Sequence, residues 1–101
     1  MDATAFYPSR WLKADDIGEH MKVKVLKLTK EEVQDETVPV LHMTAENQKL
    51  KPLILNRTNS GTMIELFGKE TDNWIGKEIE LFTVPMPSAT RGRAIRIRLP
   101  Q

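Results

Sequence analysis

The sequence contains no cysteine, which excludes disulfide bonds and zinc sites built on thiolates. Aromatic residues make up only 6% of the chain. No apolar run approaches the roughly 20 residues that span a bilayer. Neither sign of charge dominates, because 15 basic residues oppose 14 acidic ones and leave a net charge of +1. These absences argue against a disulfide scaffold, a membrane helix and a strong overall attraction to DNA.

The length of the chain, 101 residues, suits one domain with one hydrophobic core. Residues 1–9 contain alanine, threonine, proline and serine and are expected to form a flexible arm, so we expect a single domain over residues 10–101. The first residues lack the basic and apolar regions of a signal peptide, which predicts a cytoplasmic protein without membrane contact.

The most distinctive pattern lies near the end of the sequence. Residues 95–99 alternate between apolar side chains and arginine, which predicts a strand with one apolar and one cationic face. Arginine binds phosphates and stacks on flat rings, so this pattern favours nucleic-acid binding. The alternative is a charged edge strand that prevents aggregation. The arginines of this stretch are Arg91, Arg93, Arg96 and Arg98.

Local patterns predict five strands and one helix. The expected strands cover residues 22–29, 38–45, 49–55, 78–84 and 93–99. A change of hydrophobic phase between Val25 and Leu26 predicts a β-bulge in the first strand. Residues 59–67 have helical spacing and end at Gly68. We therefore expect a mainly β protein, a five-stranded OB-fold-like barrel with one helix between strands 3 and 4. The alternative is a small α+β sheet with another strand order.

From Lys51 onward, about half of the chain resembles a family of small phage and prophage proteins. The shared motifs are the lysine-proline-aliphatic-asparagine-basic-threonine-asparagine run at residues 51–59, a glycine at Gly68, the sequence at residues 71–77 and the isoleucine/arginine strand at residues 94–98. The chain departs from the family pattern at Asn73, where an acid is expected, and in a longer loop at residues 85–90. The resemblance implies an OB-type module that acts near phage replication and recombination functions.

Basic and aromatic side chains are the candidates for a binding site, because an OB barrel holds single strands with a basic groove and stacking aromatics. Phe82 has the parity that points away from the expected core, with burial by a bend of its strand as the alternative. Trp74 follows a turn and is expected to be buried. The candidate nucleic-acid-binding residues are Arg91, Arg93, Arg96, Arg98, Lys22, Lys24, Phe82, Trp11 and Tyr7, and Lys27 is a further candidate.

The sequence has no recognisable catalytic or cofactor motif. His20 and His42 lack the spacing of paired metal ligands, and no phosphate-binding glycine loop is present. The cluster of Asn56, Thr58 and Asn59 suits helix capping better than chemistry. We therefore predict a non-enzymatic protein that needs no metal or cofactor.

Two functions remain open on the sequence. The first is binding of single-stranded DNA, or of RNA, in phage replication or recombination in the host cytoplasm, as a homo-oligomer or with phage replication proteins. The second is a protein-interaction or assembly module of a phage without nucleic-acid binding. For the second, the expected edge strand at residues 49–55 would pair with a strand of the partner.

Overall fold

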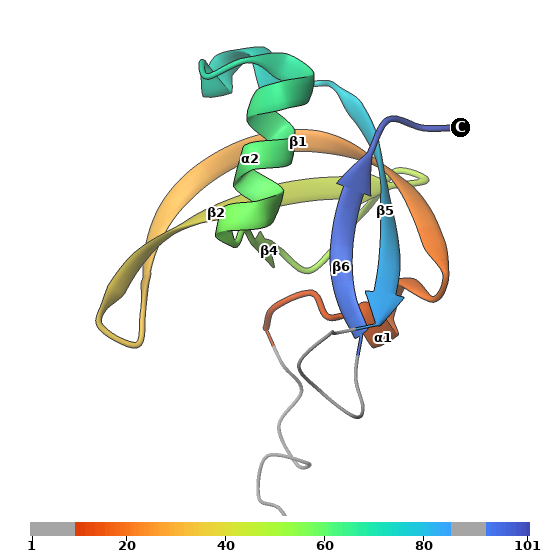
Figure 1. The fold of residues 1–101 in the computed structure, drawn as a ribbon, viewed down its shortest axis with the longest axis horizontal. Helices are drawn as coiled ribbons and strands as arrows, with labels where there is room; N and C mark the ends of the chain where they lie inside the picture. Colours follow the sequence, from red (N-terminus) through yellow and green to blue (C-terminus); the bar gives the residue numbers. More distant parts are fainter. Residues whose placement is uncertain (1–9, 86–92) are drawn as a thin grey trace, which may run out of the picture.

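A computed structural model describes residues 10–85 and 93–101 (Figure 1). Its elements in chain order are α1 (Ala14–Ile17), β1 (His20–Val33), β2 (Glu36–Ala45), β3 (Gln48–Lys49), β4 (Leu53–Ile54), α2 (Arg57–Phe67), the 3₁₀ helix η2 (Thr71–Trp74), β5 (Glu78–Pro85) and β6 (Arg93–Arg98). The described chain is mainly β with α2 between its strands, as predicted.

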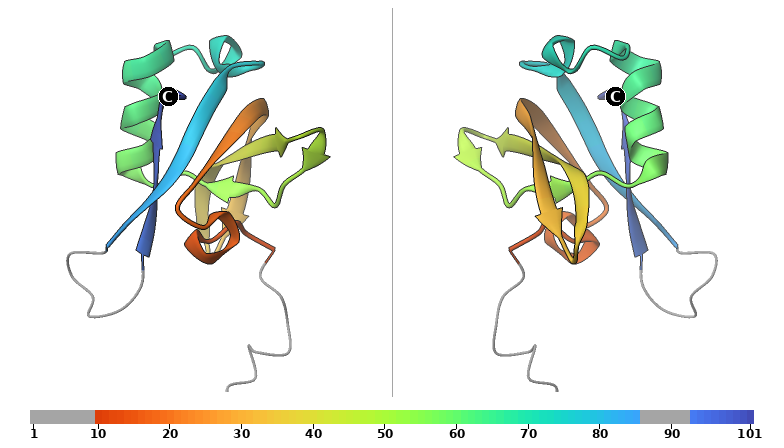
Figure 2. Two further views of the ribbon diagram at one scale, coloured as in Figure 1. Left: turned by 90° about the vertical axis from the view of Figure 1, so that its right-hand side faces the viewer. Right: turned by 90° about the vertical axis from the view of Figure 1, so that its left-hand side faces the viewer.

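The strands form one antiparallel sheet with the order β3-β2-β1-β5-β6, and β4 also pairs with β2. β1 is central, because it pairs with β2 on one side and with β5 on the other. Helix α2 packs beside β6 (Figures 1 and 2). Among the described strands the two ends of the sheet do not pair with each other, so the sheet is not closed into a barrel.

The first strand is long and bent. Its register against β2 shifts between Val25 and Lys27, so Leu26 is an extra residue at a β-bulge, as the hydrophobic phase predicted. Residues 20–24 pair with β5, and residues 24–33 pair with β2. The bend therefore lets one strand of 14 residues serve both halves of the sheet.

The expected third strand, residues 49–55, is two short strands, which is why the sheet has six strands and not five. β3 and β4 each pair with β2, and Pro52 lies between them. Proline has no N–H to donate to a ladder. The carbonyl of Pro52 accepts a hydrogen bond from the N–H of Leu12 at 2.8 Å. The N-terminal segment thus uses part of the edge that we expected to be open to a partner.

Helix α2 begins two residues before its predicted start. The side-chain oxygen of Asn56 accepts a hydrogen bond from the backbone N–H of Asn59 at 2.8 Å, so Asn56 is the N-cap. The helix ends at Gly68, whose φ of 90° lies in the region that favours glycine. Asn59 was expected to cap the helix, but its side chain is 2% exposed and donates Nδ2 to the carbonyl of Ile95 at 3.0 Å.

The core lies between the inner face of the sheet and α2. Its fully buried members include Leu41, Met43, Met63, Ile79 and Leu81. Trp74 is 4% exposed and donates its Nε1–H to the carbonyl of Gly68 at 2.9 Å, so its predicted structural role is confirmed.

Candidate nucleic-acid interface

The face of the sheet opposite the core, which we call the outer face, carries most of the predicted binding residues. Side chains of directly opposed residues in an antiparallel pair lie on the same face. The cross-strand rows on the outer face of β1, β5 and β6 are Lys24–Glu78, Lys22–Glu80–Arg98 and His20–Phe82–Arg96. Two lysines, two arginines and Phe82 from the predicted set therefore share one face.

Four lysines on the outer face are exposed and form no ion pair with a described acidic residue. They are Lys22, Lys24 and Lys27 of β1 and Lys49 of β3. Within the described ranges, none of them has an ion pair shorter than 4.0 Å. Lys49 extends the row of Lys24, because both residues pair with Thr44 of β2. Their ammonium groups are available to a phosphate.

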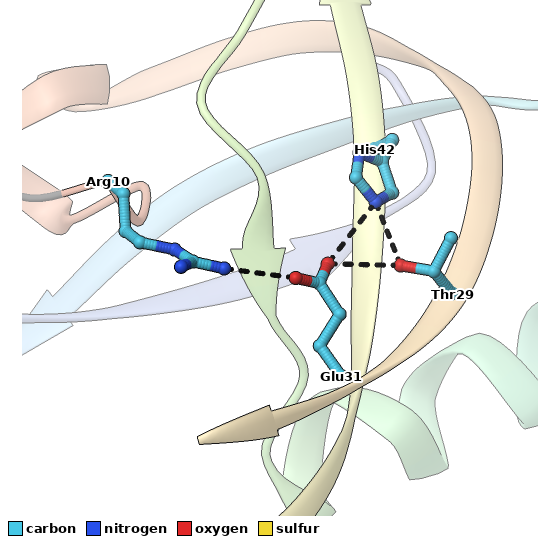
Figure 3. Close-up of polar contacts among 4 residues, drawn as sticks. All are labelled: Arg10, Thr29, Glu31 and His42. Atoms are coloured by element: carbon cyan, nitrogen blue, oxygen red, sulfur yellow. Dashed lines mark hydrogen bonds and ion pairs between the residues drawn. The ribbon is translucent and has the colours of Figure 1, made fainter. Parts of the chain in front are cut away.

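His42 of β2 lies among these charges. Its Nε2 is 2.9 Å from the hydroxyl of Thr29 and 3.7 Å from a carboxylate oxygen of Glu31 (Figure 3). Burial lowers the pKa of His42 from its usual 6.5, and the charges of Lys27 and Lys49 lower it further, while Glu31 partly opposes them. This shift of the pKa favours the neutral form of the ring, which serves as a hydrogen-bonding partner.

Trp11 is half-buried and its ring is covered by a cation. The guanidinium carbon of Arg10 lies 4.3 Å from the ring centroid, within the range of a cation–π contact. Arg10 Nη2 also bonds Glu31 Oε1 at 3.0 Å, so the carboxylate connects Arg10 to His42 and Thr29 (Figure 3). A base approaching Trp11 from this side would meet the guanidinium plane before the indole.

The ring of Phe82 on β5 is also covered by a cation. The guanidinium carbon of Arg98 lies 4.5 Å from its ring centroid. Arg98 Nε also donates to Oε2 of Glu80 at 2.5 Å, and Glu80 is 3% exposed. The charge of Arg98 is therefore largely used by a buried carboxylate, and Phe82 is half-buried beneath it.

Of the other arginines, Arg93 does not share the outer face, whereas Arg96 shares it but is bonded to the protein backbone. Arg93 has the parity of buried Ile95, and its Nε and Nη2 donate to the hydroxyl and carbonyl of Thr83 at 2.9 and 3.0 Å. Arg96 is half-buried and donates Nη1 to the carbonyl of Ile95 at 3.0 Å. Arg91 and Tyr7 lie outside the described residues. The closing arginines thus do not form one cationic row.

The tip of the β1–β2 hairpin, at one end of the outer face, is acidic. β1 and β2 project from the body and are joined at Gln34 and Asp35, whose φ values are 51° and 67° (Figure 1). Exposed Glu32 and Glu36 flank this turn. Carboxylates repel phosphates, so a bound strand is expected to stay toward the other end of β1.

A groove of about 770 Å³ opens beside the lysines, between residues 20–24 of β1 and the β2–β3 hairpin. Lys22 and Lys24 line one wall, and Thr44 and Leu50 belong to the other. A smaller pocket of about 380 Å³ lies near Asn59 and Arg93.

Sequence reasoning identified Lys22, Lys24 and Lys27 but missed Lys49 and the network of His42. The signal for Lys49 was weak because it lies on a two-residue strand beside a turn. The parity of Arg93 with Ile95, in contrast, was readable in the sequence. In residues 10–85 and 93–101, no group of three or more His, Cys, Asp or Glu side chains is placed to hold a metal ion.

The same ranges contain no helix of the length and hydrophobicity needed to cross a bilayer. No protein-family model, curated protein or solved structure matches this chain. Membership in the phage family therefore stays a prediction from the sequence motifs.

Proposed function

We propose that this protein is a non-enzymatic, OB-fold-like module that binds single-stranded DNA on the outer face of its sheet. The observation that carries the proposal is the set of four exposed lysines on one face, none paired with a described acid. Such lysines can neutralise phosphates without first breaking an ion pair, and each neutralised phosphate releases counterions. This release supplies the binding free energy.

The strand order supports an OB-like identity. β1, the first expected strand, pairs with β2 and with β5, the fourth expected strand. β6, the last strand, pairs with β5, and α2 lies between β4 and β5 in the chain. OB-folds bind oligonucleotides on the face of their second and third strands. In this chain that face carries His42 on β2 and Lys49 on β3, beside Lys27 of β1.

The aromatic contacts support binding with little sequence preference. The rings of Trp11 and Phe82 each lie beneath an arginine, so a base would stack on a guanidinium plane. Backbone contacts dominate such an interface and carry no base information. A role in phage replication or recombination, in the host cytoplasm, is part of the proposal and is supported by the sequence motifs alone.

Fluorescence anisotropy with a labelled oligo-dT of about 15 nucleotides tests the proposal, since one OB-fold covers up to about that length. We expect tighter binding of the single strand than of a duplex, with affinity falling steeply as salt increases. Lys24→Ala and Lys49→Ala should each reduce the slope of log affinity against log salt by about 0.7. Lys69→Ala removes the same charge from an exposed position after α2 and should leave the slope unchanged.

Equal slopes for the Lys24→Ala, Lys49→Ala and Lys69→Ala proteins would place the DNA elsewhere. Negligible affinity for both single and double strands at low salt would overturn the proposal altogether. Equal affinity for oligo-U would extend the ligand class to RNA, because the 2′-hydroxyl is what distinguishes the two.

The alternative, a protein-interaction module, is favoured by a different feature. Among the described residues, the edge of β1 opposite β5 has no strand partner over residues 20–23.

A further inference from the structure

Within residues 10–85 and 93–101, strand β1 is paired on only one side over its first four residues. Its partners on β5 run from His20 to Lys24, whereas its partners on β2 begin at Lys24. β2 then turns away into the β2–β3 hairpin, which projects from β1 and β5 in Figure 2. A strand edge therefore opens in the middle of the sheet.

The backbone atoms on this edge follow from the alternation of the strand. In an antiparallel ladder a residue's N–H and C=O point to the same side, and successive residues alternate. Val25 donates its N–H to Lys77 and accepts from Gly76, both on the side of β5, at 2.9 and 2.8 Å. The odd-numbered residues of this stretch therefore face β5, and the N–H and C=O of His20 and Lys22 face the open edge.

The groove of about 770 Å³ lies against this edge. On the inner side its lining is apolar, with Met21 and Val23 from β1 and Ala45 and Leu50 from the opposite wall. On the outer side it presents Lys22 and Lys24. The groove therefore offers the main-chain N–H and C=O groups of His20 and Lys22, an apolar inner side and two lysines on its outer side.

We propose that this groove binds an extended acidic segment of a partner protein, which adds to β1 as a strand. A peptide backbone matches alternating N–H and C=O groups, whereas a nucleic-acid backbone presents acceptors alone. The segment would alternate, with acidic side chains beside Lys22 and Lys24 and apolar side chains toward Met21 and Leu50. This proposal does not rest on DNA binding.

Charge favours an acidic segment over a second copy of this chain as the occupant of the groove. Glu80, the cross-strand neighbour of Lys22, is already bonded to Arg98, so Lys22 lacks an acid of its own. Glu46 and Glu78 also line the groove and would repel carboxylates of the bound segment. We therefore expect the acidic residues of the segment to lie closest to Lys22. Two copies of this chain joined at the same edge would bring Lys22 and Lys24 against their own counterparts, and like charges opposed across strands are destabilising.

Amide hydrogen exchange tests the free edge. We expect the amides of His20 and Lys22 to exchange rapidly in the free protein and those of Met21 and Val23 to be protected, because only the latter face β5. Protection of Lys22 equal to that of Val23 in the free protein would show that the edge is already satisfied and would overturn the proposal.

A capped synthetic peptide of about eight residues, alternating glutamate and valine, is the binding probe. We expect it to shift the amide resonances of residues 20–24 and 44–50 in ¹⁵N spectra and to protect Lys22 from exchange. The matching lysine–valine peptide should cause neither effect. A glutamate–valine peptide N-methylated on its backbone should bind at least about tenfold more weakly, since it keeps the side chains but loses main-chain donors. Equal binding of the methylated peptide would overturn the proposal.

Two variants at one position separate backbone from charge. Lys22→Ala removes the ammonium group and keeps the N–H, whereas Lys22→Pro removes both and breaks no described hydrogen bond of the sheet. We expect Lys22→Pro to bind the peptide several-fold more weakly than Lys22→Ala, and both to lose DNA affinity equally. Circular dichroism verifies that each variant folds. Equal peptide affinities for the two folded variants would contradict strand addition, and if Lys22→Pro does not fold, the methylated peptide decides.

Discussion

At the scale of single residues, Glu80 limits how much Arg98 can contribute to phosphate binding. It is a carboxylate in the middle of a sheet face, 3% exposed, with Arg98 bonded to one oxygen and His20 Nδ1 3.7 Å from the other. A buried charge is tolerated only when it is paired. Arg98 is therefore a structural partner of Glu80 first, and its contribution to phosphate binding is secondary to that of the unpaired lysines.

Replacing Arg98 should for this reason cost more stability than replacing its neighbour. Arg98→Met removes the hydrogen bond that the buried carboxylate of Glu80 accepts from Arg98, and we expect a loss of about 2–3 kcal/mol in the free energy of unfolding. Arg96→Met removes only a bond to the carbonyl of Ile95 and should cost less than about 1 kcal/mol. Urea unfolding of both variants at pH 7 measures the difference. Equal losses would mean that Glu80 is not stabilised by Arg98.

His42 should make the stability depend on pH. Its pKa is lowered in the folded protein, mainly by burial, so around its unfolded value of 6.5 the unfolded chain binds more protons. The stabilising contribution is therefore complete above that pH and is lost as the pH falls through 6.5 toward the folded pKa. Urea unfolding between about pH 8 and 5 should show this decrease, and His42→Gln should remove it. His20→Gln, an exposed control, should retain it; parallel curves for wild type and His42→Gln would contradict the assignment.

At the scale of elements, the sequence was informative wherever structure follows from local pattern. Val23 and Val25 alternate with Lys22 and Lys24 in the sequence, and in the structure the valines are buried and the lysines are exposed on the outer face. The phase change after Val25 located the bulge. Gly68 marked the end of α2, whereas Asn56 was only one of three expected capping residues and the predicted start was two residues late.

Other features depend on contacts between distant residues, which no local pattern contains. The side chain of Asn59 does not cap the helix as predicted, because it donates a hydrogen bond to the carbonyl of Ile95, 36 residues away, inside the core. The expected third strand is interrupted at Pro52, because proline has no N–H to donate and its carbonyl accepts a hydrogen bond from the N–H of Leu12. The covering of Trp11 and Phe82 by arginines likewise depends on tertiary placement of the rings.

The N-cap of α2 gives a prediction at this scale. Asn56→Ala removes the acceptor for the N–H of Asn59, and we expect a loss of about 1 kcal/mol in unfolding free energy. Asn56→Asp keeps an acceptor and should be close to wild type. Thr58→Ala, at an exposed position whose hydroxyl makes no described bond, is the matched control and should change stability by less than about 0.5 kcal/mol. Thermal unfolding of the three variants checks the order; a loss in Thr58→Ala as large as in Asn56→Ala would argue against a specific cap.

At the scale of the whole molecule, the net charge of +1 conceals a separation of charge. The outer face carries the unpaired lysines, and the projecting β1–β2 hairpin ends in carboxylates. Fields of this kind act over about a Debye length, roughly 10 Å at 0.1 M salt. At 0.01 M salt this length is about 30 Å, so at low salt the acidic tip should weaken binding of a polyanion on the neighbouring face without touching it.

Neutralising the tip should strengthen DNA binding. We expect the triple variant Glu32→Gln, Asp35→Asn and Glu36→Gln to bind oligo-dT about 2–5-fold more tightly at low salt, with the gain disappearing at about 0.5 M salt. The triple variant Glu65→Gln, Glu70→Gln and Asp72→Asn changes the net charge equally at exposed positions around α2 and η2. If both triple variants gain equally, only the net charge matters and the outer face is not the binding surface.

The shared strand β1 also has a consequence for synthesis of the chain on the ribosome. β1 is complete at residue 33, but β5, which covers the edge of residues 20–24, begins at Glu78. At about 5–20 residues per second, the roughly 45 residues between them take about 2–9 s to make. During that interval the β1–β2 hairpin can form while an apolar strand edge stays uncovered. Lys22 and Lys24 place charge beside this edge, and we expect this charge to reduce aggregation of the nascent chain.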